Sequence, residues 1–175
     1  FRYARQNPAE AGARFVQFVT SADTRSWSPF APVRIAGYRA ADGDIYFFAA
    51  QLNPLDPTTL VALAPLVHRG CGCIGLLASR DGARWSRVLP LLRAEVDLSG
   101  ARTTSHPVAR LVRRGDAVLL YVHRHVWLSK GLGIQLDAKG LLKEGEPFRH
   151  RRVVAYTIPL AVFANWTAPM LGTLR

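Results

Sequence analysis

The 175-residue sequence is poor in cysteine, methionine and long apolar runs, and each deficit excludes something. Its two cysteines, in the stretch RGCGC, are too close together for an unstrained disulfide and too few for a tetrahedral zinc site. No apolar run approaches the roughly 18 residues of a membrane-spanning helix. The chain begins with Phe1 instead of methionine, so we expect a piece of a longer protein and assign it no compartment.

Acidic residues are also scarce, and the formal net charge is +11. Such a balance is typical of proteins that bind nucleic acid. Here, however, 20 of the 23 basic residues are arginines spread along the chain, and no nucleic-acid-binding motif accompanies them. We therefore do not expect a nucleic-acid partner. A basic surface for polyanions remains a third hypothesis behind the two developed below.

Short β-rich runs separated by glycine, proline and aspartate dominate the sequence. β-Branched and aromatic residues are enriched in most of them, and turn-forming residues bound them. The predicted strands are 14–21, 44–52, 60–67, 73–79, 108–114, 117–126 and 152–159. The last stretch, PLAVFANWTAPML, is compatible with a short helix or with a closing strand.

One pattern occurs twice, because TSADTRSWS and ASRDGARWS place Ser, Asp, Trp and Ser in the same register 58 residues apart. The two copies contain Ser21, Asp23, Trp27 and Ser28, and Ser79, Asp81, Trp85 and Ser86. In each turn we expect Asp to accept backbone N–H groups, Ser to close the turn and Trp to pack across the hairpin onto the sheet. Recurrence of such a unit in an all-β chain predicts a β-propeller.

The repeat defines a blade of four antiparallel strands: 44–52 (inner), 60–67, 73–79 and, as the outer strand, Trp85 to about Leu92. The preceding blade contributes its last two strands, and the following blade begins near His106 and continues through 117–126 to 152–159. The chain therefore predicts a single partial all-β propeller domain, 1–175, of roughly two to three blades. The offset exceeds the usual roughly 40–50 residues per blade, so we expect the loop LNPLDPTT to be expanded.

The Ser-x-Asp-x-x-x-Trp turn resembles the Asp box of sialidase-type propellers, although Gly82 comes one residue early and the first copy has no glycine. A similar turn occurs in the five-bladed propellers of invertase, levansucrase and arabinanase-like glycoside hydrolases. The chain from about residue 14 to 160 resembles that glycosidase-like superfamily, chiefly in IYFFAAQLNPLDPTTLVALAPLV and HPVARLVRRGDAVLLYVHR. The resemblance implies a carbohydrate ligand and hydrolysis of glycosidic bonds.

The strand order of a propeller places the segments 68–72 and 93–107 on the ligand face and both Ser-x-Asp turns on the opposite face. Glycoside hydrolysis usually needs two carboxyl groups, and the resemblance implies an Asp at the start of an inner strand. The third blade has TSHPV there, without an acid, so the catalytic candidates are Glu95 and Asp97. Five other acids are assigned to turns: Asp23, Asp42, Asp44, Asp81 and Asp116.

The segment YVHRHV, residues 121–126, supplies candidate sugar contacts. Alternation along a strand puts Tyr121, His123 and His125 on one face and Arg124 on the other. The substrate-binding candidates are His68, His106, Tyr121, His123, Arg124 and His125. Histidines at i and i+2 can share a metal with a third such as His106, but no carboxylate or cysteine accompanies them. We assign neither a metal nor a cofactor, and a purely structural polar strand stays open.

The sequence thus predicts a carbohydrate-active, glycoside hydrolase-like protein. The alternative is a non-catalytic propeller that binds glycan or protein partners through the same face. Two carboxylates about 5–10 Å apart in a central pocket would favour hydrolysis. A pocket of His, Arg and aromatic residues without such a pair would favour binding alone.

Overall fold

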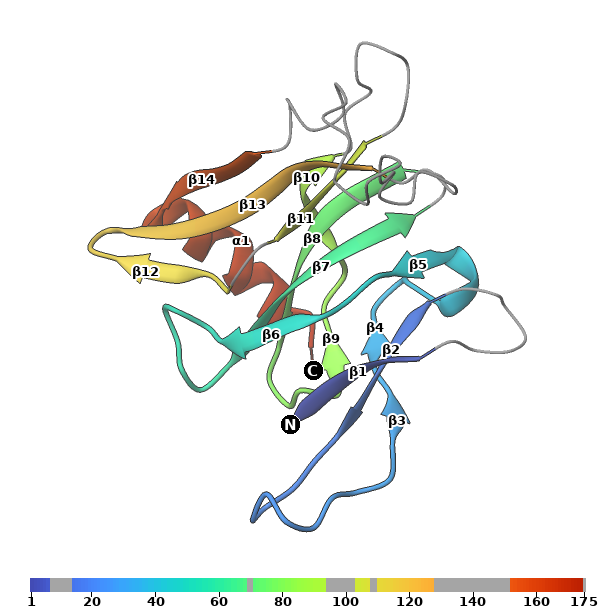
Figure 1. Cartoon of the computed structure of the whole chain (residues 1–175). Coiled ribbons are helices and arrows are strands. Elements are labelled where there is room, and N and C mark those ends of the chain that lie inside the picture. The colour runs from blue at the N-terminus through green and yellow to red at the C-terminus, as the bar shows by residue number, and fades with distance from the viewer. Residues whose placement is uncertain (7–13, 69–70, 94–102, 108–109, 128–151, 175) are drawn as a thin grey trace, which may run out of the picture.

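Three β-sheets and one α-helix make up the part of the chain that the computed structural model describes, which is residues 1–6, 14–68, 71–93, 103–107, 110–127 and 152–174. Figure 1 shows the second sheet in the middle, with the first sheet on one side and the third on the other. The predicted all-β fold is confirmed, and the strand pairs are antiparallel apart from one short parallel pair, Arg34–Ile35 with Arg84–Trp85. No helix in these ranges is long and apolar enough to cross a membrane.

The first sheet has the strand order β1-β2-β3. Its strands are β1 (Arg2–Gln6), β2 (Phe15–Val19) and β3 (Ala31–Pro32). The expectation of two strands here was wrong, because Arg2–Gln6 pairs with β2 along its whole length. The sequence RYARQ is mostly polar, so its pattern gave no sign of a buried strand.

The second sheet is the central layer and contains the predicted blade. It comprises β4 (Arg34–Ile35), β5 (Gly43–Ile45), β6 (Ala49–Leu52), β7 (Leu60–His68), β8 (Cys71–Ser79), β9 (Arg84–Trp85) and β10 (Leu89–Arg93), with the 3-10 helix η1 (Ala40–Asp42) before β5. β5 and β6 pair with β7, β7 with β8, and β8 with β9 and β10, all antiparallel as predicted. The predicted inner and outer strands are each interrupted, at 46–48 and 86–88.

The third sheet is a meander around its longest strand. It comprises β11 (Thr103–Pro107), β12 (Val112–Arg114), β13 (Ala117–Trp127) and β14 (Arg152–Pro159). β11 and β12 pair with one edge of β13, and β14 pairs with the other. The stretch after β14, for which helix and strand were both open, is the helix α1 (Leu160–Gly172).

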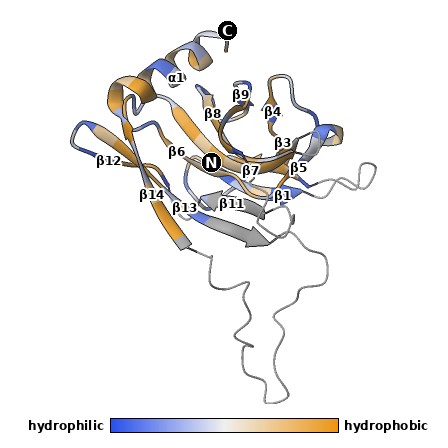
Figure 2. Cartoon of the chain, turned by 90° about the horizontal axis from the view of Figure 1, so that it is seen from above, coloured by the Kyte–Doolittle hydropathy of each residue, from blue (hydrophilic) through white to orange (hydrophobic). Residues whose placement is uncertain are grey.

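The core is divided in two by β7 and β8, whose apolar residues point to opposite faces in alternation. Between the first and second sheets, the buried residues include Ala62, Ala64, Leu66, Leu77, Phe15, Ile45 and Trp85. Between the second sheet, the third sheet and α1, they include Val61, Leu63, Ile74, Leu76, Val118, Leu120, Val122 and Phe163. Figure 2 shows the resulting apolar colouring of β7 and α1. Because both faces of β7 and β8 are covered, successive residues of these strands are apolar and do not alternate with polar ones.

A side-chain amide connects the second and third sheets. The Gln51 Nε2 group donates to the Leu111 carbonyl oxygen at 2.9 Å, and the Leu111 N–H group donates to Gln51 Oε1 at 2.6 Å. The two bonds imitate a pair of backbone hydrogen bonds between strands that are not neighbours. Leu111 is 4% exposed, so its main-chain groups depend on this amide.

We predict that Gln51→Ala lowers the free energy of unfolding by about 1–3 kcal/mol, because it leaves a buried N–H group without its acceptor. Urea unfolding followed by tryptophan fluorescence measures the change. The matched control is Gln17→Ala, since Gln17 is half-buried and its side chain makes no hydrogen bond with the described residues. Equal stabilities of the two variants would contradict the prediction.

Candidate functional site

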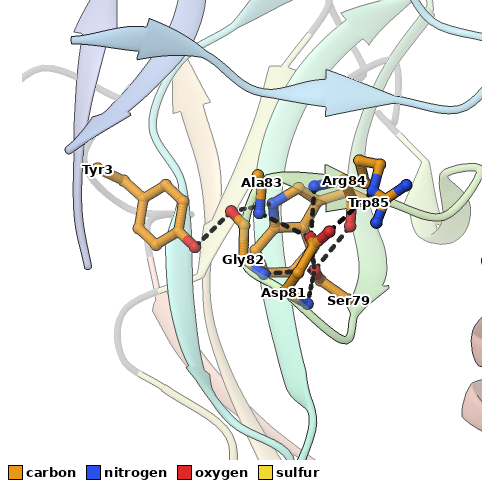
Figure 3. Close-up of polar contacts among 7 residues, drawn as sticks. All are labelled: Tyr3, Ser79, Asp81, Gly82, Ala83, Arg84 and Trp85. Atoms are coloured by element: carbon orange, nitrogen blue, oxygen red, sulfur yellow. Dashed lines mark hydrogen bonds and ion pairs between the residues drawn. The ribbon is translucent and has the colours of Figure 1, made fainter. Parts of the chain in front are cut away.

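The second Ser-x-Asp turn, between β8 and β9, is a closed hydrogen-bond network (Figure 3). Asp81 Oδ1 accepts the N–H groups of Ala83 and Arg84 at 3.0 and 2.8 Å, and Asp81 Oδ2 accepts Arg84 Nε at 2.8 Å. The Trp85 indole donates to the Gly82 carbonyl oxygen at 3.0 Å. All these partners lie within the hairpin, so this carboxylate is committed to the turn.

The first turn, 58 residues earlier, repeats the two N–H bonds to the aspartate and the indole bond, but not the bond from the arginine side chain. Asp23 Oδ1 accepts the N–H groups of Arg25 and Ser26, and the Trp27 indole donates to the Thr24 carbonyl oxygen. Each closing serine hydroxyl also accepts the N–H group of the residue eight positions before it, Ser28 from Thr20 and Ser86 from Ala78. The missing glycine has a structural counterpart, because Thr24 has φ 61° where Gly82 has φ 72°.

The two tryptophans differ in their surroundings. Trp85 is 1% exposed and meets the rings of Phe48 and Tyr3 edge-on, with centroids 4.7 and 5.9 Å away. The Tyr3 hydroxyl also donates to the Gly82 carbonyl oxygen at 2.8 Å, as Figure 3 shows. Trp27 is half-buried, with the guanidinium of Arg2 4.5 Å above its ring. The second turn is therefore a junction between the first two sheets, and the first turn is a surface hairpin.

Folding favours the ionised form of Asp81. Partial burial acts to raise its pKa, but the hydrogen bonds from the Arg84 N–H group, the Arg84 guanidinium and the Ala83 N–H group outweigh this and lower the pKa to about 2. The pKa of Asp23 is also lowered, first by the N–H groups of Ser26 and Arg25 and then by the Ser21 hydroxyl. Both carboxyl groups therefore stabilise their turns as anions.

We predict that the free energy of unfolding falls as the pH drops from about 4 towards 2. Because the pKa of Asp81 is depressed in the folded state, its contribution is complete above its ordinary pKa of about 4 and is lost as the pH approaches 2. Urea unfolding at pH 5 and pH 2.5 measures the fall, which should be smaller in Asp81→Asn and unchanged in Asp116→Asn. An identical fall in Asp81→Asn would refute the assignment.

We predict that substitution lowers stability at one of the two left-handed positions and has little effect at the other. Gly82→Ala should cost about 1–3 kcal/mol, because a Cβ there is strained at φ 72° and lies 2.9 Å from Phe1 Cε1 and Tyr3 Oη. Thr24→Gly should change stability by less than about 0.5 kcal/mol, since relief of strain offsets the extra freedom of the unfolded chain. Thermal unfolding compares the variants, and a large loss in Thr24→Gly would contradict this.

The residues expected from sequence to carry function are only partly within the described structure. Glu95 and Asp97 lie outside it. His68, His106, Arg124 and His125 belong to strands β7, β11 and β13, whose backbone alone is described at those positions. In the backbone register, His106 lies opposite His123 on the neighbouring strand.

Tyr121 and His123 lie together on β13. Both side chains are half-buried, whereas Val122 between them is fully buried in the core. Alternation therefore places Tyr121 and His123 on the face of the third sheet that points away from the second sheet. Their backbone partners on β14 are Ala155 and Val153.

Sequence analysis missed a polar cluster at the start of the inner strand, at the end of the second sheet where β5 and β8 begin and β7 ends. We call this the open end; the second Ser-x-Asp turn lies at the other end of β8. Asp44 was assigned to a turn, and this was wrong, because it is the second residue of β5 and pairs with Val67. The sequence ADGD is typical of a turn. The turn, however, is η1, which ends at Asp42, and β5 begins at the next residue.

Asp44 is held by Arg14, the residue directly before β2. Its Oδ1 accepts the Arg14 N–H group at 2.6 Å, and its Oδ2 lies 3.4 Å from Arg14 Nη1. The Arg14 guanidinium also stacks 4.7 Å from the centre of the Tyr46 ring. Ile45, which lies between Asp44 and Tyr46 in the sequence, is fully buried. Because side chains alternate along a strand, Asp44 and its partner Arg14 lie on the face opposite to Ile45.

Tyr38 lies next to this cluster. Its hydroxyl donates to the Val67 carbonyl oxygen at 3.2 Å, and its ring stacks on Phe15. Burial, followed by the negative charges of Asp44 and Asp42, raises the pKa of Tyr38, so this phenol stays a neutral donor. The open end thus combines a carboxylate, a guanidinium and phenol rings.

The described residues do not form a pair of free carboxyl groups. Asp42, two residues before Asp44, accepts the Arg39 N–H group at 2.7 Å and lies 3.7 Å from the Arg39 guanidinium. The arrangement can bind hydroxyl groups and a ring face. It does not by itself supply the acid and base of glycoside hydrolysis.

Comparison with known proteins adds little. No protein family and no curated protein matches the sequence. One solved structure that the chain matches, with 16% sequence identity and a TM-score of 0.49, is an N-acetylgalactosamine deacetylase from F. plautii in complex with blood group B trisaccharide. The match covers 97% of this chain and 48% of the deacetylase, so the chain spans about half of that protein's length. So distant a likeness does not carry an activity across.

Proposed function

We propose that this chain is part of a carbohydrate-active β-propeller of the glycosidase-like kind, and that its open end binds sugar. The observation that carries the proposal is the position of Asp44, a carboxylate at the start of an inner strand. The resemblance seen in the sequence implies an acid at that point of a blade. The ion pair with Arg14 fixes the direction of this carboxylate.

The chemistry of the cluster suits a sugar. A carboxylate accepts hydrogen bonds from hydroxyl groups, and a guanidinium donates several in a fixed plane. The Tyr46 ring, already stacked against Arg14, offers an apolar surface for the C–H face of a sugar ring. Asp44 is 31% exposed and Arg14 40% exposed, so both retain surface for a ligand.

The propeller part of the proposal is supported by the two matching turns. In both turns the aspartate accepts hydrogen bonds from two N–H groups, and the indole donates to the carbonyl oxygen of the left-handed residue. Each follows a strand that is central in its own sheet. Two units with the same turn, stacked through an apolar interface, are what successive blades require.

We expect binding to a panel of mono- and oligosaccharides, measured by calorimetry, to identify a ligand whose affinity falls about tenfold or more in Asp44→Asn. Asparagine keeps an acceptor for the Arg14 N–H group but loses the charge, and hydrogen bonds to charged groups contribute about 1.5–3 kcal/mol. Tyr46→Ala should weaken binding as well. Asp116→Asn, on the turn between β12 and β13, is the control. The proposal would be refuted if the folded protein bound no sugar, or if Asp44→Asn bound sugar with unchanged affinity.

Hydrolysis is the stronger form of the proposal and needs a second carboxyl group. Glu95 and Asp97 are the proposed sources, since their segment follows β10 at its Arg93 end, and Arg93 pairs with Cys73 near the open end. Release of nitrophenol from nitrophenyl glycosides tests this, and Glu95→Gln or Asp97→Asn should reduce the rate at least about 100-fold. Sugar binding without any cleavage would favour the non-catalytic alternative.

A further inference from the structure

A cavity of about 330 Å³ lies at the margin of the core between the first and second sheets. Its wall comes from the turn after β4, from facing residues of β7 and β8, and from the segment that joins β9 to β10. The lining residues are Ala36, Gly37, Tyr38, Leu66, Cys73, Arg87, Val88 and Pro90. The cavity falls within the size range of small-molecule sites.

Two glycines near the cavity differ in how closely side chains pack against them. At Gly75 an added Cβ would lie 2.5 Å from Val88 Cγ1 and 3.0 Å from Leu66 Cδ2, so the sheet is filled there. At Gly37, which has φ 69°, the nearest atom to an added Cβ is Arg87 Nε at 3.7 Å. The bare backbone of Gly37 therefore faces the Arg87 side chain without filling the space between them.

The lining is mostly apolar and contains one cation. Within the described ranges, Arg87 has no acidic partner, and no carboxyl group lines the cavity. The two acids whose charges act on Tyr38 each already face an arginine, Asp44 with Arg14 and Asp42 with Arg39. An anion in the cavity would therefore meet one uncompensated positive charge beside apolar walls.

We propose that this cavity binds a small organic anion, a carboxylate on a body about the size of one ring. Arg87 holds the carboxylate in two parallel hydrogen bonds. The side chains of Leu66, Val88 and Pro90 contact the body of the ligand. This site shares Tyr38 with the open end, but it does not depend on the sugar site proposed there.

Cys73 provides a direct probe, because this cysteine is half-buried and lines the cavity. In a Cys71→Ser background it is the only thiol of the chain. Alkylation by iodoacetate or iodoacetamide is the same reaction, in which sulfur bonds to the carbon that bears iodine and iodide leaves. The reagents differ in charge, so the ratio of their rates reports the charge that Arg87 places in the cavity.

We expect Arg87→Ala to lower the iodoacetate-to-iodoacetamide rate ratio at Cys73 by about threefold or more, and Arg87→Lys to retain most of it. The matched control is Arg34→Ala, an exposed arginine outside the lining, which should leave the ratio unchanged. Thermal unfolding of each variant verifies the fold. An unchanged ratio in Arg87→Ala would overturn the proposal.

Ligand protection completes the test. Benzoate should slow alkylation of Cys73 by iodoacetamide, whereas benzamide, of the same shape without the charge, should not. Glucuronate against glucose distinguishes an acidic sugar from an aromatic acid. Protection by benzoate should persist in Asp44→Asn, which separates this site from the open end. Equal protection by benzoate and benzamide, or by neither, would refute the anion site.

Discussion

The two-sided burial of the β7–β8 hairpin is the constraint on which the rest of the structure depends. Ala64 and Gly75 face one another in the backbone register, and small residues such as these allow the neighbouring layers to approach closely. Fully burying a side chain such as Leu63 or Ile74 contributes about 1.5–3 kcal/mol. In the described parts of the two outer sheets, no hairpin is buried on both faces, and their buried residues pack against the second sheet.

This constraint also separates the two ends of the second sheet. At one end, the polar groups of the Ser-x-Asp turn form hydrogen bonds within the hairpin. Tyr3, from the first sheet, and Trp85 both donate to the Gly82 carbonyl oxygen of this turn. At the other end, Arg14 and Asp44 form a pair that remains partly exposed. The exposure of the two aspartate side chains is similar, 37% for Asp81 and 31% for Asp44. They differ in their partners: Asp81 is held by N–H groups of its own turn, and Asp44 is held by Arg14, which is 30 positions away in the sequence.

The central strands could be predicted because their apolar runs and bounding turns are local signals. The fold around β7, β8, β13 and β14 therefore matched the sequence closely. Asp44 was missed since its letters also suit a turn, and only the pairing of β5 with β7 shows otherwise. The Gln51 contact to Leu111 joins residues 60 positions apart, and no local pattern reports it. The cavity beside Arg87 is also invisible to local patterns, because four separate segments line it.

The repeated turn leaves one position free to acquire a separate task. Between the serine and the aspartate, the first copy has Ala22 and the second has Arg80, and neither side chain takes part in the turn's own bonds. Arg80 Nε instead donates to the Leu171 carbonyl oxygen at 3.3 Å, at the last turn of α1. A cation there offsets the negative end of the helix dipole. An identical backbone template thus serves as a plain surface loop in one place and as a helix anchor in the other, at the cost of a single side chain.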